Sequence, residues 1–350
     1  MNWSYTHAHR QGSGTTEVVA VLIAITGDKA RVLTVDTGKL LPNGPLMPLH
    51  RSLQAGVRQW VEEQTQQPLG YIEQLYTFVD THRRNADGHA LVYVSYLGLV
   101  QETQLCELES QAVWRDWYDY FPWENHLQGP PEAISDLIMP ELAKWAAASE
   151  TANQRLRREQ RIALCWGLQV ATETTSEPAT TKSVTSKTAT PKTVTTKTQT
   201  TDIDWVSEHA LLRYEMLYEA GLLPESPAYQ PNKLPASWPK IIGKPMYYDH
   251  RRVIATAISR LRAKIEYRPL IFGLMPDAFT LSQLQQSVEA LSGVKLHKQN
   301  FRRLLEHQDL VEPTGESSNA SRGRPAKLYR FRYDIELQSL LMDSKLPKRK

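Results

Sequence analysis

The feature that most constrains the fold of this chain is a long polar tract in its middle. Residues 171–201 consist mainly of Thr, Lys, Ser and Ala, with two prolines and almost no large apolar side chain. Such a segment buries too little surface to offset its ordering entropy, so it is expected to be a flexible linker. The 350 residues are therefore predicted to fold as two parts, which their number also favours.

The predicted organisation has four parts. Residues 1–170 are expected to form a first domain, 171–203 the linker, 204–340 a second domain and 341–350 a basic tail. No apolar stretch reaches the roughly 18 residues that cross a bilayer, and the N-terminus lacks a secretory signal pattern. We therefore expect a cytoplasmic protein without membrane contact. Its two cysteines, Cys106 and Cys165, suggest neither a disulfide framework nor a zinc site.

The charge is unevenly distributed along the chain. Residues 251–350 hold 19 Lys+Arg against 10 Asp+Glu, a net +9, whereas the first 250 residues hold 22 against 28, a net −6. A basic C-terminal third beside a weakly acidic remainder is typical of a protein that binds a polyanion such as nucleic acid.

The first part is expected to mix strands and helices. An apolar, β-branched run at residues 18–25 predicts a strand buried on both faces, which pairs with residues 30–35 across a turn. A loop rich in Pro and Gly then leads to an amphipathic helix at residues 53–66. Further strands are predicted at residues 71–78 and 90–100, and helices at residues 111–120, 131–147 and 153–165.

The second part begins with helical patterns at residues 204–219 and 251–264, the latter strongly basic. Thr280 and Gln283 then stand at capping-box spacing and predict a short helix that stops at Gly293. A second helix is expected from about residue 297, with Phe301, Leu304 and Leu305 inward. Two short helices joined by a glycine-containing turn match a helix-turn-helix.

The second of these helices carries chemistry suited to reading DNA. Its expected outer face holds Lys298, Gln299, Arg302 and Arg303. Lys and Arg neutralise phosphates or contact guanine, and Gln bonds adenine in the major groove. The alternative interpretation is an ordinary solvated basic face.

A hairpin is expected after the two helices. Residues 310–313 and 327–332 read as strands around a polar loop, which makes the hairpin a candidate wing. Arg322 and Arg324 in the loop, with Lys327 at its end, are predicted to contact phosphate or a narrow minor groove.

The loop and helix at residues 44–65 resemble the Nudix hydrolase signature in spacing but not in all of its chemistry. The signature aligns without gaps on Gly44, His50, Arg58, Gln59, Trp60, Glu62, Glu63 and Thr65. In that family glutamates of the box hold divalent metal ions through hard oxygen ligands. Here Glu62 and Glu63 remain, but Gln59 and His50 stand where carboxylates are expected. The alternative interpretation of this segment is an ordinary amphipathic helix with solvated charges.

Several blocks together carry a wider resemblance. They are residues 41–46, 58–65 and 70–78 in the first part and residues 267–274, 298–303, 311–315 and 323–331 in the second. With these blocks the chain resembles Nudix-related transcriptional regulators of NAD metabolism. The resemblance implies an α+β fold, with an N-terminal Nudix-like α/β/α sandwich around a mixed sheet and a C-terminal winged helix-turn-helix.

The resemblance also implies a function. It suggests a homodimeric repressor of NAD biosynthesis or salvage genes that releases double-stranded DNA when ADP-ribose, NAD or ATP occupies a catalytically degenerate Nudix domain. No cofactor, metal or catalytic residue is expected. By position, His50, Arg58, Gln59, Glu62 and Glu63 would bind the nucleotide, although Arg58 could instead brace the helix against its loop. Two alternatives stay open: an active pyrophosphohydrolase on ADP-ribose-like nucleotides, and a nonspecific RNA-binding or scaffolding protein.

Overall fold

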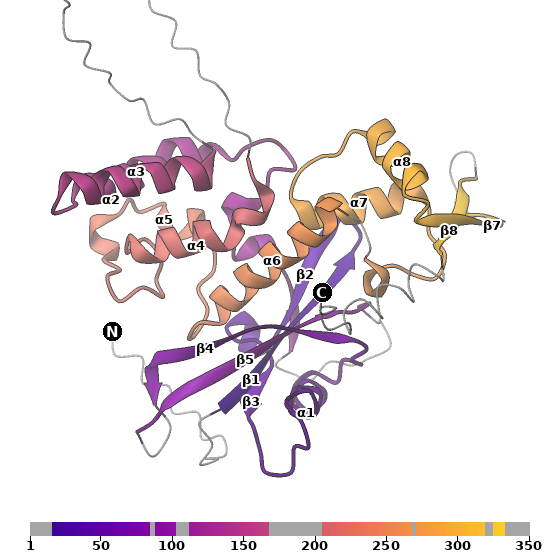
Figure 1. Ribbon diagram of the computed structural model, residues 1–350, viewed down its shortest axis with the longest axis horizontal. Helices are drawn as coiled ribbons and strands as arrows, with labels where there is room; N and C mark the ends of the chain where they lie inside the picture. Colours follow the sequence, from indigo (N-terminus) through magenta and orange to yellow (C-terminus); the bar gives the residue numbers. More distant parts are fainter. Residues whose placement is uncertain are drawn as a thin grey trace, which may run out of the picture. The chain divides into compact units, whose positions relative to one another are not determined.

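The computed structural model describes residues 16–84, 88–102, 112–167, 205–267, 271–318 and 325–332 (Figure 1). The chain divides into two compact units, one made of Met1–Pro140 with Ser207–Lys350 and a smaller one made of Glu141–Val206. The predicted linker and basic tail lie outside the described residues, and the predicted domain boundaries stay predictions. No helix in the described parts is long and apolar enough to cross a membrane.

The larger unit is built on a six-stranded mixed sheet in the order β4-β5-β1-β2-β6, with β3 paired to β1. Strand β1 (Thr16–Thr26) runs parallel to β5 (Ala90–Leu99) and antiparallel to β2 (Lys29–Thr34) and β3 (Asn43–Pro45). At the two edges, β4 (Ile72–Arg84) pairs antiparallel with β5, and β6 (Val113–Asp116) pairs antiparallel with β2. The predicted strands of the first part are confirmed.

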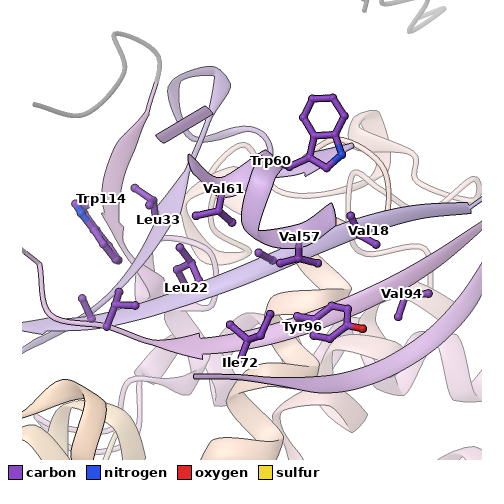
Figure 2. Packing of buried hydrophobic residues seen from close by; sticks show 13 residues of the cluster. Val18, Leu22, Leu33, Val57, Trp60, Val61, Ile72, Val94, Tyr96 and Trp114 are labelled. Carbon is purple, nitrogen blue, oxygen red and sulfur yellow. The ribbon is translucent and has the colours of Figure 1, made fainter. Parts of the chain in front are cut away.

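Strand β1 is buried on both faces because helices cover both sides of the sheet. Its alternate residues Val18, Ala20, Leu22 and Ala24 belong to the core cluster beneath α1 (Leu53–Thr65), which contributes Val57, Trp60 and Val61 (Figure 2). Successive side chains of a strand point to opposite faces, so Val19, Val21 and Ile23, all fully buried, face the other way. Helix α6 (His250–Tyr267) contacts β1 and β4, and α7 (Leu281–Ser292) contacts β2. The second helical layer therefore comes from the C-terminal half of the chain.

The C-terminal winged helix comprises α7, α8 (Lys298–His307), β7 (Val311–Ser317) and β8 (Lys327–Phe331). The predicted capping box forms, since Thr280 accepts from the Gln283 amide while the Gln283 side chain accepts from the Thr280 amide. Gly293 ends α7 with φ of +79°, and β7 pairs antiparallel with β8. The predicted α+β fold with a C-terminal winged helix is confirmed.

One element differs from its prediction. Residues 111–120 were expected to be a helix, but β6 occupies Val113–Asp116 and a 3-10 turn covers Trp117–Asp119. The apolar spacing that suggests a helix also suits a strand that buries Trp114, followed by a turn that buries Trp117. Pairing with the open edge of β2 decides between them, because aromatic residues favour a half-buried pleated surface.

Along the described part of the chain, four α-helices follow β6 before α6. Helix α4 (Ala210–Glu219) follows a 3-10 turn at Ser207–His209, and α5 (Trp238–Ile241) is one short turn. A π-helical turn at Ile134–Ile138 continues into α2 (Met139–Ala147). The smaller unit holds the rest of α2 and α3 (Ala152–Trp166), where Arg158 donates to the Trp145 carbonyl oxygen at 2.8 Å.

Candidate functional site

The loop that enters the Nudix-like box is fixed against α1 by close contacts. A Cβ at Gly44 would lie 2.3 Å from Trp60 Cε2, so only glycine fits beneath this indole. Trp60 Nε1 donates to the Pro45 carbonyl oxygen at 2.9 Å, and the Gln64 side chain bonds both the amide and the carbonyl of Asn43 at 3.1 and 2.7 Å. The glycine spacing noted in the sequence therefore has a packing origin.

His50, Gln59 and Glu63 form one directional hydrogen-bond chain. The Met47 amide donates to His50 Nδ1 at 3.0 Å, which places the ring proton on Nε2. That Nε2 donates to Gln59 Oε1 at 2.9 Å, and Gln59 Nε2 donates to Glu63 Oε1 at 2.8 Å. The two residues that replace carboxylates of the signature thus bond to each other, and Gln59 also bonds the remaining carboxylate of Glu63.

This donor set does not fit the magnesium-type site of a Nudix hydrolase. Such a hard cation needs carboxylate oxygens, whereas the positions of two carboxylates are held here by a neutral imidazole and an amide. Both ring nitrogens of His50 already form hydrogen bonds, and the side-chain oxygen and nitrogen of Gln59 bond His50 and Glu63. Glu62 lies exposed on α1.

Arg58 points away from this chain. Its two terminal nitrogens donate to the carbonyl oxygens of Leu69 and Gly70, each at 2.6 Å. The contacts join α1 to the segment before β4, which is the bracing arrangement considered for this residue. The structure brings His50, Gln59 and Glu63 together, and ligand binding by these three, Arg58 and Glu62 stays a prediction.

The candidate DNA-reading face lies on α8. Phe301 and Leu305 are buried at 5% and 1% exposure and fix one side of the helix to the core. The four predicted contact residues, Lys298, Gln299, Arg302 and Arg303, are all exposed. Their exposure is what a groove-facing surface needs, and their role in DNA binding stays a prediction.

The turn before α8 is organised by Glu289, a residue that the sequence did not single out. Its carboxylate is largely buried and accepts from the Leu296 amide at 3.1 Å, Gln285 Nε2 at 2.9 Å and Lys295 Nζ at 2.8 Å. Burial alone would raise the pKa of Glu289, but the hydrogen bonds from Lys295 and Gln285 hold this pKa below its usual value. The charged carboxylate therefore fixes the start of the predicted recognition helix.

The wing is attached to the start of α7. Phe279 and Tyr329 exchange two backbone hydrogen bonds of 2.9 and 2.8 Å. Arg330 of β8 pairs with Glu312 at 2.7 Å, and Arg332, directly after β8, pairs with Asp309. Lys327, at the start of β8, is exposed. The predicted contact residues Arg322 and Arg324 lie outside the described residues.

A buried ionic junction lies where the segment after β6 meets helices α4, α6 and α7. Glu124 accepts from Arg213 Nε of α4 at 2.6 Å and from Arg262 of α6 at 2.5 Å, and all three side chains are fully buried. Burial alone would raise the pKa of Glu124, but the two guanidinium groups hold it below its usual value. Arg262 Nε also donates to the Leu291 carbonyl oxygen at 3.0 Å, which ties the junction to the end of α7.

A second contact joins the Nudix-like loop to the other end of α6. His250, the first residue of α6 and 1% exposed, accepts from the Leu41 amide at 2.9 Å through Nδ1. Helix α6 therefore touches the box loop at its first residue and the winged helix at Arg262. Sequence reasoning saw only a basic helix here, because nothing in the sequence shows which arginines meet a buried carboxylate far away in the chain.

Comparison with known proteins supports the winged helix directly. Residues 271–331 match the family model described as the NrtR DNA-binding winged helix domain. The chain is 39% identical over 97 residues to the ADPR responsive transcriptional repressor NtrR of Acinetobacter baylyi, a match that covers 27% of this chain and 38% of that repressor.

Two solved structures are also similar to this chain. Shewanella oneidensis NrtR complexed with a 27mer DNA shares 20% identity and a TM-score of 0.49, over 92% of this chain and 95% of that one. The NUDIX domain of the same protein, complexed with ADP ribose, shares 26% identity and a TM-score of 0.27, over 34% of this chain and 82% of that one.

Proposed function

We propose that the chain is a member of the NrtR family, on the match of its C-terminal winged helix after a Nudix-like domain, and that it is an ADP-ribose-responsive transcriptional repressor. The observation that carries the proposal is the exposed face of α8, where cations and an amide stand opposite the buried Phe301 and Leu305. Such a face supplies both phosphate contacts and base contacts. The regulated genes are proposed to serve NAD biosynthesis or salvage.

We propose that the Nudix-like domain senses a nucleotide and does not hydrolyse it. Support comes from the His50–Gln59–Glu63 chain. Its side chains bond one another at positions where a metal site would need free oxygen ligands. ADP-ribose is the first candidate effector, and NAD and ATP are the other two. Release of AMP or phosphate with Mg²⁺ or Mn²⁺ tests this proposal. Turnover that the Glu62→Gln variant abolishes would establish the pyrophosphohydrolase instead.

Regulation is proposed to pass through α6. This helix bonds the box loop through His250 and meets Glu124 and the end of α7 through Arg262. A ligand changes DNA affinity only by its differential affinity for the DNA-competent and DNA-incompetent arrangements. The contacts of α6 at its first residue and at Arg262 would connect the proposed ligand site to the winged helix.

A two-fold homodimer on a palindromic operator completes the proposal. Half-sites for such dimers lie about one helical turn, or a multiple of it, apart. Sedimentation of the full chain with and without operator DNA tests the oligomeric state, and a single copy per operator would contradict it.

The decisive experiment is a fluorescence-anisotropy titration on DNA upstream of NAD biosynthesis genes, with random duplex as competitor. We expect specific binding that ADP-ribose reverses, while NAD and ATP serve as comparison ligands. Equal affinity for random and promoter duplex would refute the repressor and favour the nonspecific binding alternative.

A further inference from the structure

The outer face of α8 holds a stripe of three side chains with different hydrogen-bonding chemistry. Gln299, Arg303 and Glu306 occupy positions i, i+4 and i+7 and are all exposed. Because an α-helix turns about 100° per residue, these positions share one side, opposite Phe301 and Leu305. Lys298 and Arg302 flank the stripe on one side.

Glu306 is the unexpected member of this stripe. A carboxylate on a surface that faces phosphates is repelled by DNA of every sequence. Within the part of the chain that the structure describes, no salt bridge or side-chain hydrogen bond is found for Glu306, although Arg302 and Arg303 lie one turn earlier. Arg303 instead lies 3.5 Å from Asn300 Oδ1. The carboxylate oxygens of Glu306 therefore remain available as acceptors on the reading face.

The chemistry of the stripe matches the major-groove edges of three bases. A glutamine bonds adenine at N6 and N7, an arginine bonds guanine at O6 and N7, and a glutamate accepts from N4 of cytosine. At about 1.5 Å rise per residue, seven residues span about 10 Å, which is close to three base-pair steps of about 3.4 Å. One short helix can thus present the three groups to neighbouring base pairs.

We propose that Glu306 is a specificity-determining residue that accepts a hydrogen bond from N4 of a cytosine, beside Gln299 on adenine and Arg303 on guanine. The inference rests on the proposed DNA-binding function and names the base that this part of the site takes. The repulsion between Glu306 and phosphate is uniform over all sequences, whereas the cytosine contact offsets it at one base pair only. Glu306 therefore lowers general affinity and sharpens discrimination.

The test selects binding sites from a random duplex pool with the full-length wild type and with Glu306→Gln and Glu306→Asp, followed by anisotropy on single-base variants of the selected site. We expect the wild type to prefer cytosine at one position by roughly 5- to 100-fold. Glu306→Gln keeps the length of the side chain but turns an acceptor into an amide, so that position should shift toward adenine. Glu306→Asp keeps the charge but shortens the reach, so the cytosine preference should fall without a gain of adenine.

Lys298→Met is the matched control on the same helix, because it keeps a long side chain but removes the charge and adds no group that reads a base. It removes a cation that is expected to contact phosphate, so it should weaken binding to all sequences, reduce the salt dependence and leave every base preference unchanged. If Glu306→Gln retains the wild-type preference at every position and only changes overall affinity, Glu306 acts as a charge alone and the inference is wrong. If the wild type selects no sequence at all, the proposed function fails together with the inference.

Discussion

Glu124 is the residue on which the C-terminal helices of the larger unit converge. Two arginines from different helices neutralise one fully buried carboxylate. Removing the charge of this carboxylate leaves both guanidinium groups buried without a counter-charge. We expect Glu124→Gln to lower the free energy of unfolding by about 3–5 kcal/mol, the usual cost of breaking a buried ion pair from one side. Urea denaturation measures this change.

A surface ion pair supplies the control. Lys244 Nζ and Asp119 Oδ2 lie 2.7 Å apart with both side chains partly exposed. Asp119→Asn should change the free energy of unfolding by less than about 1 kcal/mol, because solvent screens such a pair. Similar small losses in both variants would mean that the buried junction does not hold the unit together.

His126 should make the stability of the protein fall as the pH drops below neutrality. Burial disfavours its charged form and lowers the pKa of His126 from its ordinary 6.5 to about 4, so the unfolded chain takes up the proton first. The contribution of neutral His126 to the free energy of unfolding is fully present above pH 6.5. It is lost as the pH falls toward 4, by at most about 3 kcal/mol. Denaturation midpoints measured between pH 7 and 5 follow this loss.

The window above pH 5 separates His126 from Glu124. Because the pKa of Glu124 is depressed, ionised Glu124 contributes fully to the free energy of unfolding above pH 4.5, the ordinary pKa of a glutamate. This contribution is lost only as the pH falls below that value. A His126→Gln variant should therefore show a flatter stability profile between pH 7 and 5 than the wild type. An unchanged slope would assign the acid sensitivity to other groups.

At the scale of elements, the end of α7 requires a glycine at position 293. Gly293 has φ of +79°, and a Cβ there would lie 2.4 Å from the Glu124 carbonyl oxygen and 2.8 Å from a terminal nitrogen of Arg262. Gly293→Ala should therefore lower the free energy of unfolding for two reasons. The backbone strain costs about 1 kcal/mol, and the added Cβ would also displace Glu124 and Arg262. We expect a loss of several kcal/mol in unfolding free energy and weaker DNA binding.

Gly315 provides a control with the same backbone geometry. Its φ is +84°, but no atom lies within 4 Å of an added Cβ. Gly315→Ala should show only the strain, so the difference between the two variants isolates crowding at the junction. Equal losses in thermal denaturation would rule out the crowding.

The elements that the sequence predicts well are those whose signals are local. The apolar run of β1, the capping box of α7 and the basic face of α8 each depend on neighbours within a few residues. Strand β6 was predicted as a helix because its structure depends on pairing with β2, some 80 residues earlier. The buried arginines of α6 were missed for the same reason, since Glu124 lies 138 residues before Arg262.

The features of the candidate site also separate into those with a local sequence signal and those set by distant contacts. Gly44 and the box spacing could be found in the sequence, and so could the exposed residues of α8. The His50–Gln59–Glu63 chain could not, because hydrogen-bond direction depends on how the loop places His50 over α1. Contacts between distant segments, such as that of His250 with Leu41, leave no local pattern at all.

At the scale of the whole molecule, α6 connects two regions that the proposed function requires to communicate. His250 replaced by Phe keeps an aromatic ring near Tyr93 and Tyr248, at 6.4 and 5.9 Å in the wild type, but removes the acceptor of the Leu41 amide. We expect the variant to bind operator DNA nearly as well as the wild type but to respond less to ADP-ribose. Allosteric couplings of about 1–3 kcal/mol correspond to 5- to 150-fold changes in affinity, and this ratio should fall toward one.

The measurement is the dissociation constant for operator DNA with and without saturating ADP-ribose, for wild type, His250→Phe and the surface variant Asp119→Asn. The surface variant also removes a contact between the sheet part and the segment before α6, so it controls for the loss of any such contact. By reciprocity, saturating DNA must weaken ADP-ribose binding by the same factor in each protein, which checks the ratios independently. A full ligand response in His250→Phe would show that the signal travels by another route than the start of α6.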